Sequence, residues 1–77
     1  MLEKELKIRF DSGSLKAASV TPAFMVEGWS LVIKDSAGND HAVTLKRGGE
    51  RVFKSIDAAC ALAREIGFST AKVVLRN

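Results

Sequence analysis

The chain has 77 residues, 47% of them hydrophobic and 27% charged, which is the size of one domain (residues 1–77) and the composition of a folded protein rather than a disordered one. Its single cysteine, Cys60, excludes an internal disulfide and the charged residues 1–5 do not resemble a signal peptide, so we expect a cytoplasmic protein. No apolar run approaches the roughly 20 residues that a membrane span needs, and no membrane association is expected.

The first third of the chain predicts two strands. Residues 5–10 alternate polar and apolar side chains, which is typical of a half-buried strand with Leu6, Ile8 and Phe10 toward the core. Asp, Ser and Gly at residues 11–14 predict a turn. Residues 15–20 predict a second strand, with a helical turn left open as the alternative, and Pro22 ends it because proline lacks the N–H donor of a central strand.

The middle of the chain predicts a hairpin. Residues 28–34 have the clearest strand pattern, with Trp29, Leu31 and Ile33 on one face. The polar residues 35–40 predict a loop, and residues 41–46 predict the returning strand. Gly48-Gly49 suits a tight turn that needs positive φ angles, and residues 51–53 predict a short strand after it.

The hydrophobic period changes to that of a helix over residues 55–66. Ser55 is placed to cap the amino end, Asp57 complements the helix dipole there, and Gly67 suits a left-handed helix stop. The apolar stripe of this helix comprises Ile56, Ala59, Cys60, Ala63 and Ile66, with Leu62 at its flank.

With a closing strand at residues 71–76, the order β-β-β-β-(β)-α-β predicts an α+β fold. We expect a twisted, mainly antiparallel sheet of about five or six strands with one helix, residues 55–66, packed on one face. The expected core comprises Leu6, Ile8, Phe10, Trp29, Leu31, Ile33, Val43, Leu45, Phe53, Ile56, Cys60, Ala63, Ile66 and Leu75. The open face is expected to be polar and basic, with Lys7, Arg9, Ser30, Lys34, Thr44, Lys46, Lys72 and Arg76.

The residue pattern does not predict catalysis. His41 and Cys60 fall in different predicted surroundings, so they are not expected to pair, and one Cys with one His cannot form a closed zinc site. Asp35 and Asp40 bracket a loop, where acids usually serve turn geometry. Residues 47–50 are glycine-rich but lack the lysine–hydroxyl ending of a phosphate loop. We therefore expect no catalytic residue, no metal, no cofactor and no small-molecule substrate.

Positive charge is concentrated in residues 46–54, which contain four basic residues and one acidic residue and so account for the net charge of +3. Such a concentration favours an anionic partner through electrostatic steering and counterion release. The alternative is that these residues keep a hairpin tip soluble. The candidate nucleic-acid-binding residues are Lys46, Arg47, Arg51, Lys54, Lys34 and Arg9.

A second candidate surface is the apolar stretch at residues 23–26, which follows Pro22. Either it folds over the edge of the sheet and closes the core, or it is exposed and two copies pair through it. In the second case Phe24 and Met25 form a protein interface.

The segment 45–59, together with Gly28-Trp29-Ser30-Leu31 and Ile66-Gly67-Phe68, resembles a small uncharacterised family of proteobacterial proteins labelled as plasmid replication or partition proteins. More loosely, a tryptophan strand, a hairpin and Phe-x-Ser-x-Asp-Ala opening a helix are similar to the arm-binding domains of phage-type integrases, which place a three-stranded sheet on DNA. These resemblances imply an accessory DNA-binding protein for replication or partition of mobile DNA. The alternative is a protein–protein adaptor or small homodimer without DNA affinity.

Overall fold

The computed structural model describes residues 2–23, 26–44 and 49–75, and the side chain of Glu3 is outside this description. In these residues the fold is α+β, with two helices and a mixed, mostly antiparallel sheet of five strands. In chain order the elements are α1 (Glu3–Asp11), β1 (Leu15–Pro22), β2 (Trp29–Asp35), β3 (Asp40–Ala42), β4 (Val52–Phe53), α2 (Ile56–Ile66) and β5 (Lys72–Val73).

The sheet is built around β1 and β2, which pair antiparallel along most of their length. The order is β3-β2-β1-β5, and β4 pairs with the same edge of β2 as β3, at the other end of that strand. Because β5 runs parallel to β1, the chain crosses from β4 through α2 to β5 on the far edge, with β2 and β1 between them. The expected closing strand is therefore present but short.

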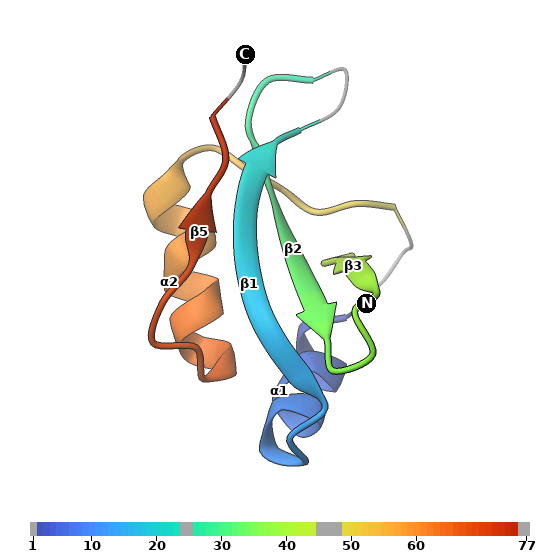
Figure 1. Ribbon diagram of the computed structural model, residues 1–77. Helices are drawn as coiled ribbons and strands as arrows, with labels where there is room; N and C mark the ends of the chain where they lie inside the picture. Colours follow the sequence, from blue (N-terminus) through green and yellow to red (C-terminus); the bar gives the residue numbers. More distant parts are fainter. Residues whose placement is uncertain (1, 24–25, 45–48, 76–77) are drawn as a thin grey trace.

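Both helices lie behind the sheet in the view of Figure 1, so one sheet face is covered and the other is open. Helix α2 packs against β1, β2 and β4, and α1 packs against α2 and β1. The core between these layers comprises Leu6, Ala18, Val20, Leu31, Ile33, Val43, Phe53, Ala59, Leu62, Ala63 and Ile66. Neither helix of the described residues has the length and apolar character needed to cross a membrane.

The expectation of a strand at residues 5–10 is wrong, because these residues form most of α1. Leu6 and Phe10 are four residues apart, so they share one face of a helix as well as one face of a strand. Leu6 is fully buried and Phe10 packs against the core, whereas Ile8 points away and is 66% exposed. The helix places Ile8 outside the core, and it removes Lys7 and Arg9 from the sheet.

The expectations for α2 and for the strand at residues 15–20 are confirmed. The Ser55 hydroxyl accepts a hydrogen bond from the Ala58 N–H at 3.2 Å, and Gly67 ends the helix with a φ of 133°. A Cβ atom at Gly67 would lie 2.5 Å from the Phe10 ring, so the absence of a side chain lets the ends of α1 and α2 meet. There the Phe10 and Phe68 rings pack edge to face, 4.9 Å apart.

One further core expectation differs from the structure, and another lies outside its described residues. Leu75 lies beyond the short β5 and is 70% exposed, so it is not a core residue. Leu45 and the turn glycine Gly48 lie outside the described residues. The returning strand predicted at residues 41–46 is only partly tested: β3 covers Asp40–Ala42, and residues 45–46 lie outside the described residues.

Candidate interaction surfaces

The basic residues proposed from the sequence do not share one described surface. Lys34 is exposed on the open face of β2, and it lies between Ala17 on β1 and Asp40 on β3. Lys34 is on the sheet face where it was expected, but the acidic residue Asp40 is its direct cross-strand neighbour. Lys54 is exposed between β4 and the Ser55 cap of α2.

Arg51 and Arg9 belong to other parts of the fold. The Arg51 guanidinium carbon lies 4.9 Å from the centre of the Phe53 ring, within cation–π range. Phe53 belongs to the core, so this contact directs Arg51 toward the helix side of β4 rather than the open face. Arg9 is in the last turn of α1, where a positive charge complements the helix dipole.

Four of the proposed contact residues lie outside the described part of the chain: Lys46, Arg47, Phe24 and Met25. Their roles as a nucleic-acid contact (Lys46, Arg47) and a protein interface (Phe24, Met25) remain predictions from the sequence.

The open face of the sheet is mainly neutral in its described part. Strand alternation and the pairing registers place these uncharged side chains on it: Ala17, Ser19, Thr21, Ser30, Val32, Ala42 and Val52. Lys34 and Lys72 share this face with Asp40, and the Ser30 hydroxyl donates a hydrogen bond to the Glu50 carboxylate. The two lysines are thus accompanied by two acids, and the expected basic face is not formed by these residues.

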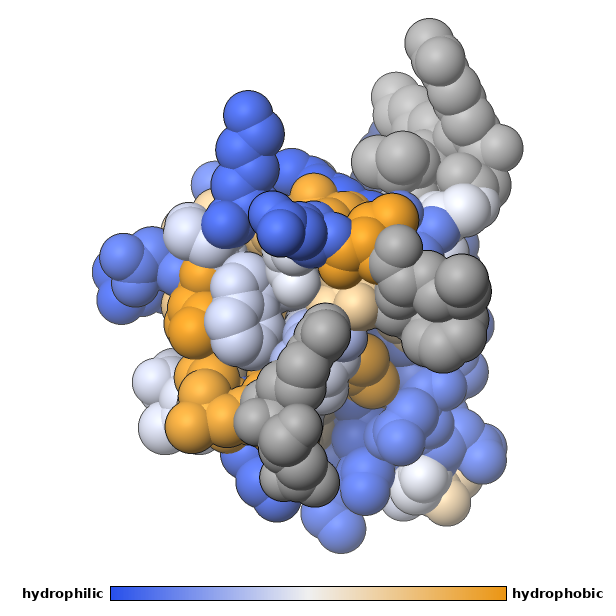
Figure 2. All heavy atoms as spheres, turned by 90° about the horizontal axis from the view of Figure 1, so that it is seen from above, coloured by the Kyte–Doolittle hydropathy of each residue, from blue (hydrophilic) through white to orange (hydrophobic). Residues whose placement is uncertain are grey.

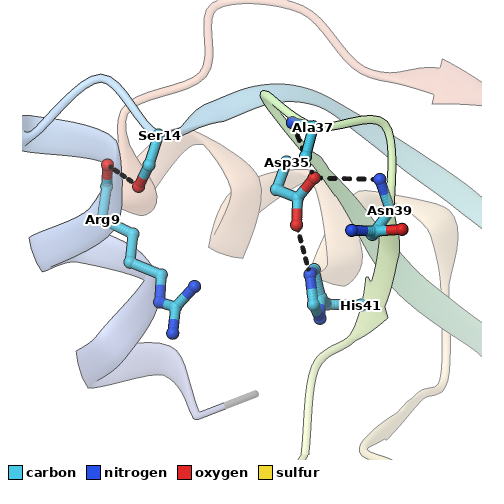
Figure 3. A network of polar contacts seen from close by, with 6 residues as sticks. All are labelled: Arg9, Ser14, Asp35, Ala37, Asn39 and His41. Carbon is cyan, nitrogen blue, oxygen red and sulfur yellow. Dashed lines mark hydrogen bonds and ion pairs between the residues drawn. The ribbon is translucent and has the colours of Figure 1, made fainter.

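A polar network organises the turn between β2 and β3 (Figure 3). Asp35 Oδ1 accepts hydrogen bonds from the backbone N–H groups of Ala37 (3.0 Å) and Asn39 (2.9 Å), and Oδ2 accepts one from His41 Nε2 at 2.8 Å. The His41 bond, followed by the Asn39 backbone bond, lowers the pKa of the Asp35 carboxyl. The pair serves the turn geometry that the sequence indicates for Asp35.

Hydrogen bonds from serine stabilise the loop after α1 (Figure 3). The hydroxyl and the N–H of Ser14 both donate to the Arg9 carbonyl, while the Arg9 guanidinium extends away from that bond. The Ser36 N–H in turn donates to the Ser14 carbonyl at 2.9 Å, which links this loop to the β2–β3 turn. Backbone and side-chain bonds thus connect the two loops at one end of the sheet.

Cys60 is a half-buried free thiol on α2, packed against the core. Within residues 2–23, 26–44 and 49–75, no three His, Cys, Asp or Glu residues are grouped as metal ligands would be.

The opposite end of the sheet exposes apolar side chains, of which only Val26 belongs to a stretch singled out from the sequence (residues 23–26). We define the apolar end as Val26, Val52, Val74 and Leu75, whose exposed fractions are 53%, 41%, 39% and 70%. Val26 precedes β2, Val52 lies beside Ser30 near the start of β2, and the Val74 N–H donates to the Val20 carbonyl near the end of β1. Figure 2, which looks onto this end, shows hydrophobic residues at the surface between hydrophilic ones.

A signal for part of this surface was present in the sequence. Val73, Val74 and Leu75 are consecutive, and a strand presents successive side chains to opposite faces. At least one of the three therefore had to point away from the core.

Comparison of the chain with protein-family models, with curated proteins and with solved structures found no match.

Proposed function

We propose that the protein is a non-catalytic binding domain that associates with another copy of itself. The observation that carries this proposal is the apolar end, where four large aliphatic side chains are exposed at the same end of the sheet. Exposed apolar side chains gathered in one region favour protein association because burying them removes apolar surface from water.

The size of the domain supports the same proposal. A single core in a chain of this length supplies only ~3–5 kcal/mol of stability, and pairing adds buried surface that the monomer lacks. The open sheet face is neutral and lined by small or β-branched side chains, so it does not oppose the approach of a second molecule by charge repulsion.

The test is the mass of the protein in solution from micromolar to millimolar concentration, measured by sedimentation. We expect the mass to rise toward that of a dimer, and Leu75→Ser to shift this rise to higher concentration. Ile8→Ser is the matched control, because Ile8 is similarly exposed but lies on α1. A constant monomer mass over the whole range would overturn the proposal.

Nucleic-acid binding is the second candidate function, and the charge of residues 46–54 favours it. Its support is the excess of basic residues in that segment and the resemblance to plasmid replication and partition proteins. In this proposal the contact is made by the segment itself rather than by the open face, since Lys34 lies beside Asp40.

Binding of mixed-sequence duplex DNA at low salt tests this second function. Replacing Lys46, Arg47, Arg51 and Lys54 by alanine should abolish binding, and the affinity of the unmodified protein should fall steeply with salt. The control replaces Lys4, Lys7, Lys16 and Arg64, which removes the same charge elsewhere. Equal loss in both variants would show that only net charge matters, and no binding at low salt would exclude the function.

A further inference from the structure

The edge strand β5 presents unpaired main-chain groups to solvent. The Val74 N–H donates to the Val20 carbonyl at 2.8 Å, and Val73 is the register partner of Val20. In a parallel pair with this register, Lys72 and Val74 make the main-chain hydrogen bonds to β1. The N–H and C=O groups of Val73 therefore point away from β1. Among the described residues, no strand lies on the outer side of β5.

The side chains around this edge are apolar and exposed. Val73 is 37% exposed, and the next two residues, Val74 and Leu75, belong to the apolar end. Exposed edges are usually blocked by proline, by a bulge, by charge or by a covering segment. Here Lys72 is the only charged residue between residues 69 and 75.

We propose that β5 pairs with β5 of a second copy, antiparallel and centred on Val73, so that one sheet runs through both molecules. This inference rests on the proposed self-association and specifies its geometry. With Val73 on the two-fold axis, the outward groups of Ala71 and Leu75 also face each other across the interface, which satisfies the edge over its described length.

The side-chain chemistry of this register is self-complementary. Each Lys72 lies opposite Val74 of the other copy, so its aliphatic stem covers the valine and the two lysines are not directly opposed. Val73 faces Val73, and Ala71 faces Leu75, so each exposed aliphatic side chain gains an apolar neighbour.

The opposite edge of the sheet is a poorer partner for β5 than β5 of a second copy. Near that edge Thr44 bridges both Leu2 and Glu50, so the chain's own segments already continue the pairing beyond β3. Pairing of β5 with that edge would also be head to tail and would build a ring or a filament, whereas pairing of β5 with β5 closes after two copies.

The main test removes the outward N–H of Val73. Val73→Pro should abolish the dimer seen by sedimentation, because proline cannot donate the central hydrogen bond. The fold should survive, since the Val73 N–H does not bond to β1, and circular dichroism checks this. Val73→Thr is the matched control, which keeps the N–H and the β-branch, and it should remain dimeric.

A cross-linking test does not depend on the tolerance of proline. In a background of Cys60→Ser, Val73→Cys should form an intermolecular disulfide under mild oxidation, because Cα atoms of a hydrogen-bonded antiparallel pair are ~5.5 Å apart. Leu75→Cys is more exposed but lies opposite Ala71, so it should cross-link at least tenfold more slowly.

These outcomes separate the inference from the function on which it rests. A dimer that persists in Val73→Pro, or faster cross-linking through Leu75→Cys than through Val73→Cys, would overturn the β5 geometry and leave self-association standing. A wild-type protein that stays monomeric would overturn both.

Discussion

The two ends of the sheet differ in how their surfaces are satisfied. At one end, which we call the closed end, the carboxyl ends of α1 and α2 meet through Phe10 and Phe68, and Ser14 links the loop after α1 to the β2–β3 turn. At the apolar end, Val26, Val52, Val74 and Leu75 remain exposed. The closed end is completed by its own residues, whereas the apolar end leaves four aliphatic side chains in contact with water, which we propose are covered by a second copy.

This difference indicates a division of roles within a small domain. Turn chemistry, an aromatic contact and a side-chain-free glycine concentrate local stability at the closed end. Because the side chains of the apolar end are exposed, we expect them to contribute less to the stability of the monomer. Substitutions at the closed end should therefore change unfolding, and those at the apolar end should change mass.

The largest effect is expected for Gly67→Ala at the closed end. Its φ of 133° strains any other residue, and the new Cβ would meet the Phe10 ring, so we expect a loss of at least about 2 kcal/mol in the free energy of unfolding. Gly38→Ala is the control, since Gly38 also has a positive φ but no atom within 4 Å of the added Cβ. Urea unfolding that gives the same loss for both would contradict the described packing.

A smaller loss is expected for Ser55→Ala, which removes the cap of α2 at the amino end of the helix. The Ala58 N–H loses its side-chain acceptor, and we expect a cost of about 1 kcal/mol in urea unfolding. Ser69→Ala, at an exposed position after the helix, should leave stability unchanged. A cap without effect would mean that water replaces the Ser55 hydroxyl fully.

The Asp35 network should make the closed end sensitive to acid. Because its pKa is lowered in the folded state, the carboxylate contributes stability above about pH 4 that is lost as the pH falls through the folded pKa. Asp35→Asn keeps an oxygen acceptor for the turn, so it should remove this part of the pH dependence of the urea midpoint. Asp40→Asn, outside the network, should retain it; identical pH profiles for Asp35→Asn and wild type would contradict the assignment.

The smallest effect on stability is expected at the apolar end. Val26→Ser replaces a side chain that is 53% exposed, and the free energy of unfolding measured at low protein concentration should change by less than about 0.5 kcal/mol. Because Val26 belongs to the apolar end, the same variant should also weaken self-association measured by sedimentation. A loss above 1 kcal/mol in the monomer, about twice the expected limit, would show that Val26 packs against the core.

The elements that could be predicted from the sequence are those in which the spacing of apolar residues fits either a helix or a strand but not both. The stripe from Ile56 to Ile66, with Ser55 and Gly67 at its ends, fits only a helix, and Trp29-Leu31-Ile33 fits only a strand. Residues 5–10 fit both, because a spacing of four satisfies both periods, and the helix that they form packs Phe10 against Phe68, a partner far away in the sequence.

The candidate site was less predictable because side-chain direction depends on tertiary contacts. Arg51 is charged and was expected to face a ligand, but a buried Phe53 ring two residues later attracts its guanidinium. Ser30 was expected on an exposed face but is buried, and its hydroxyl donates to the carboxylate of Glu50 from another segment. Arg51 and Phe53 are two residues apart and share a face of the predicted strand, so that contact could have been inferred from local sequence, whereas the Glu50 partner of Ser30, 20 residues away, could not.

The parallel pairing of β5 with β1 has a consequence for biosynthesis. Strand β1 acquires its second neighbour from Lys72 and Val73, which are translated after all the other elements of the described fold, so the sheet cannot be completed before these residues have been made. A nascent chain that stops before Lys72 leaves β1 without that neighbour, and premature termination should therefore yield an aggregation-prone product rather than a smaller folded domain.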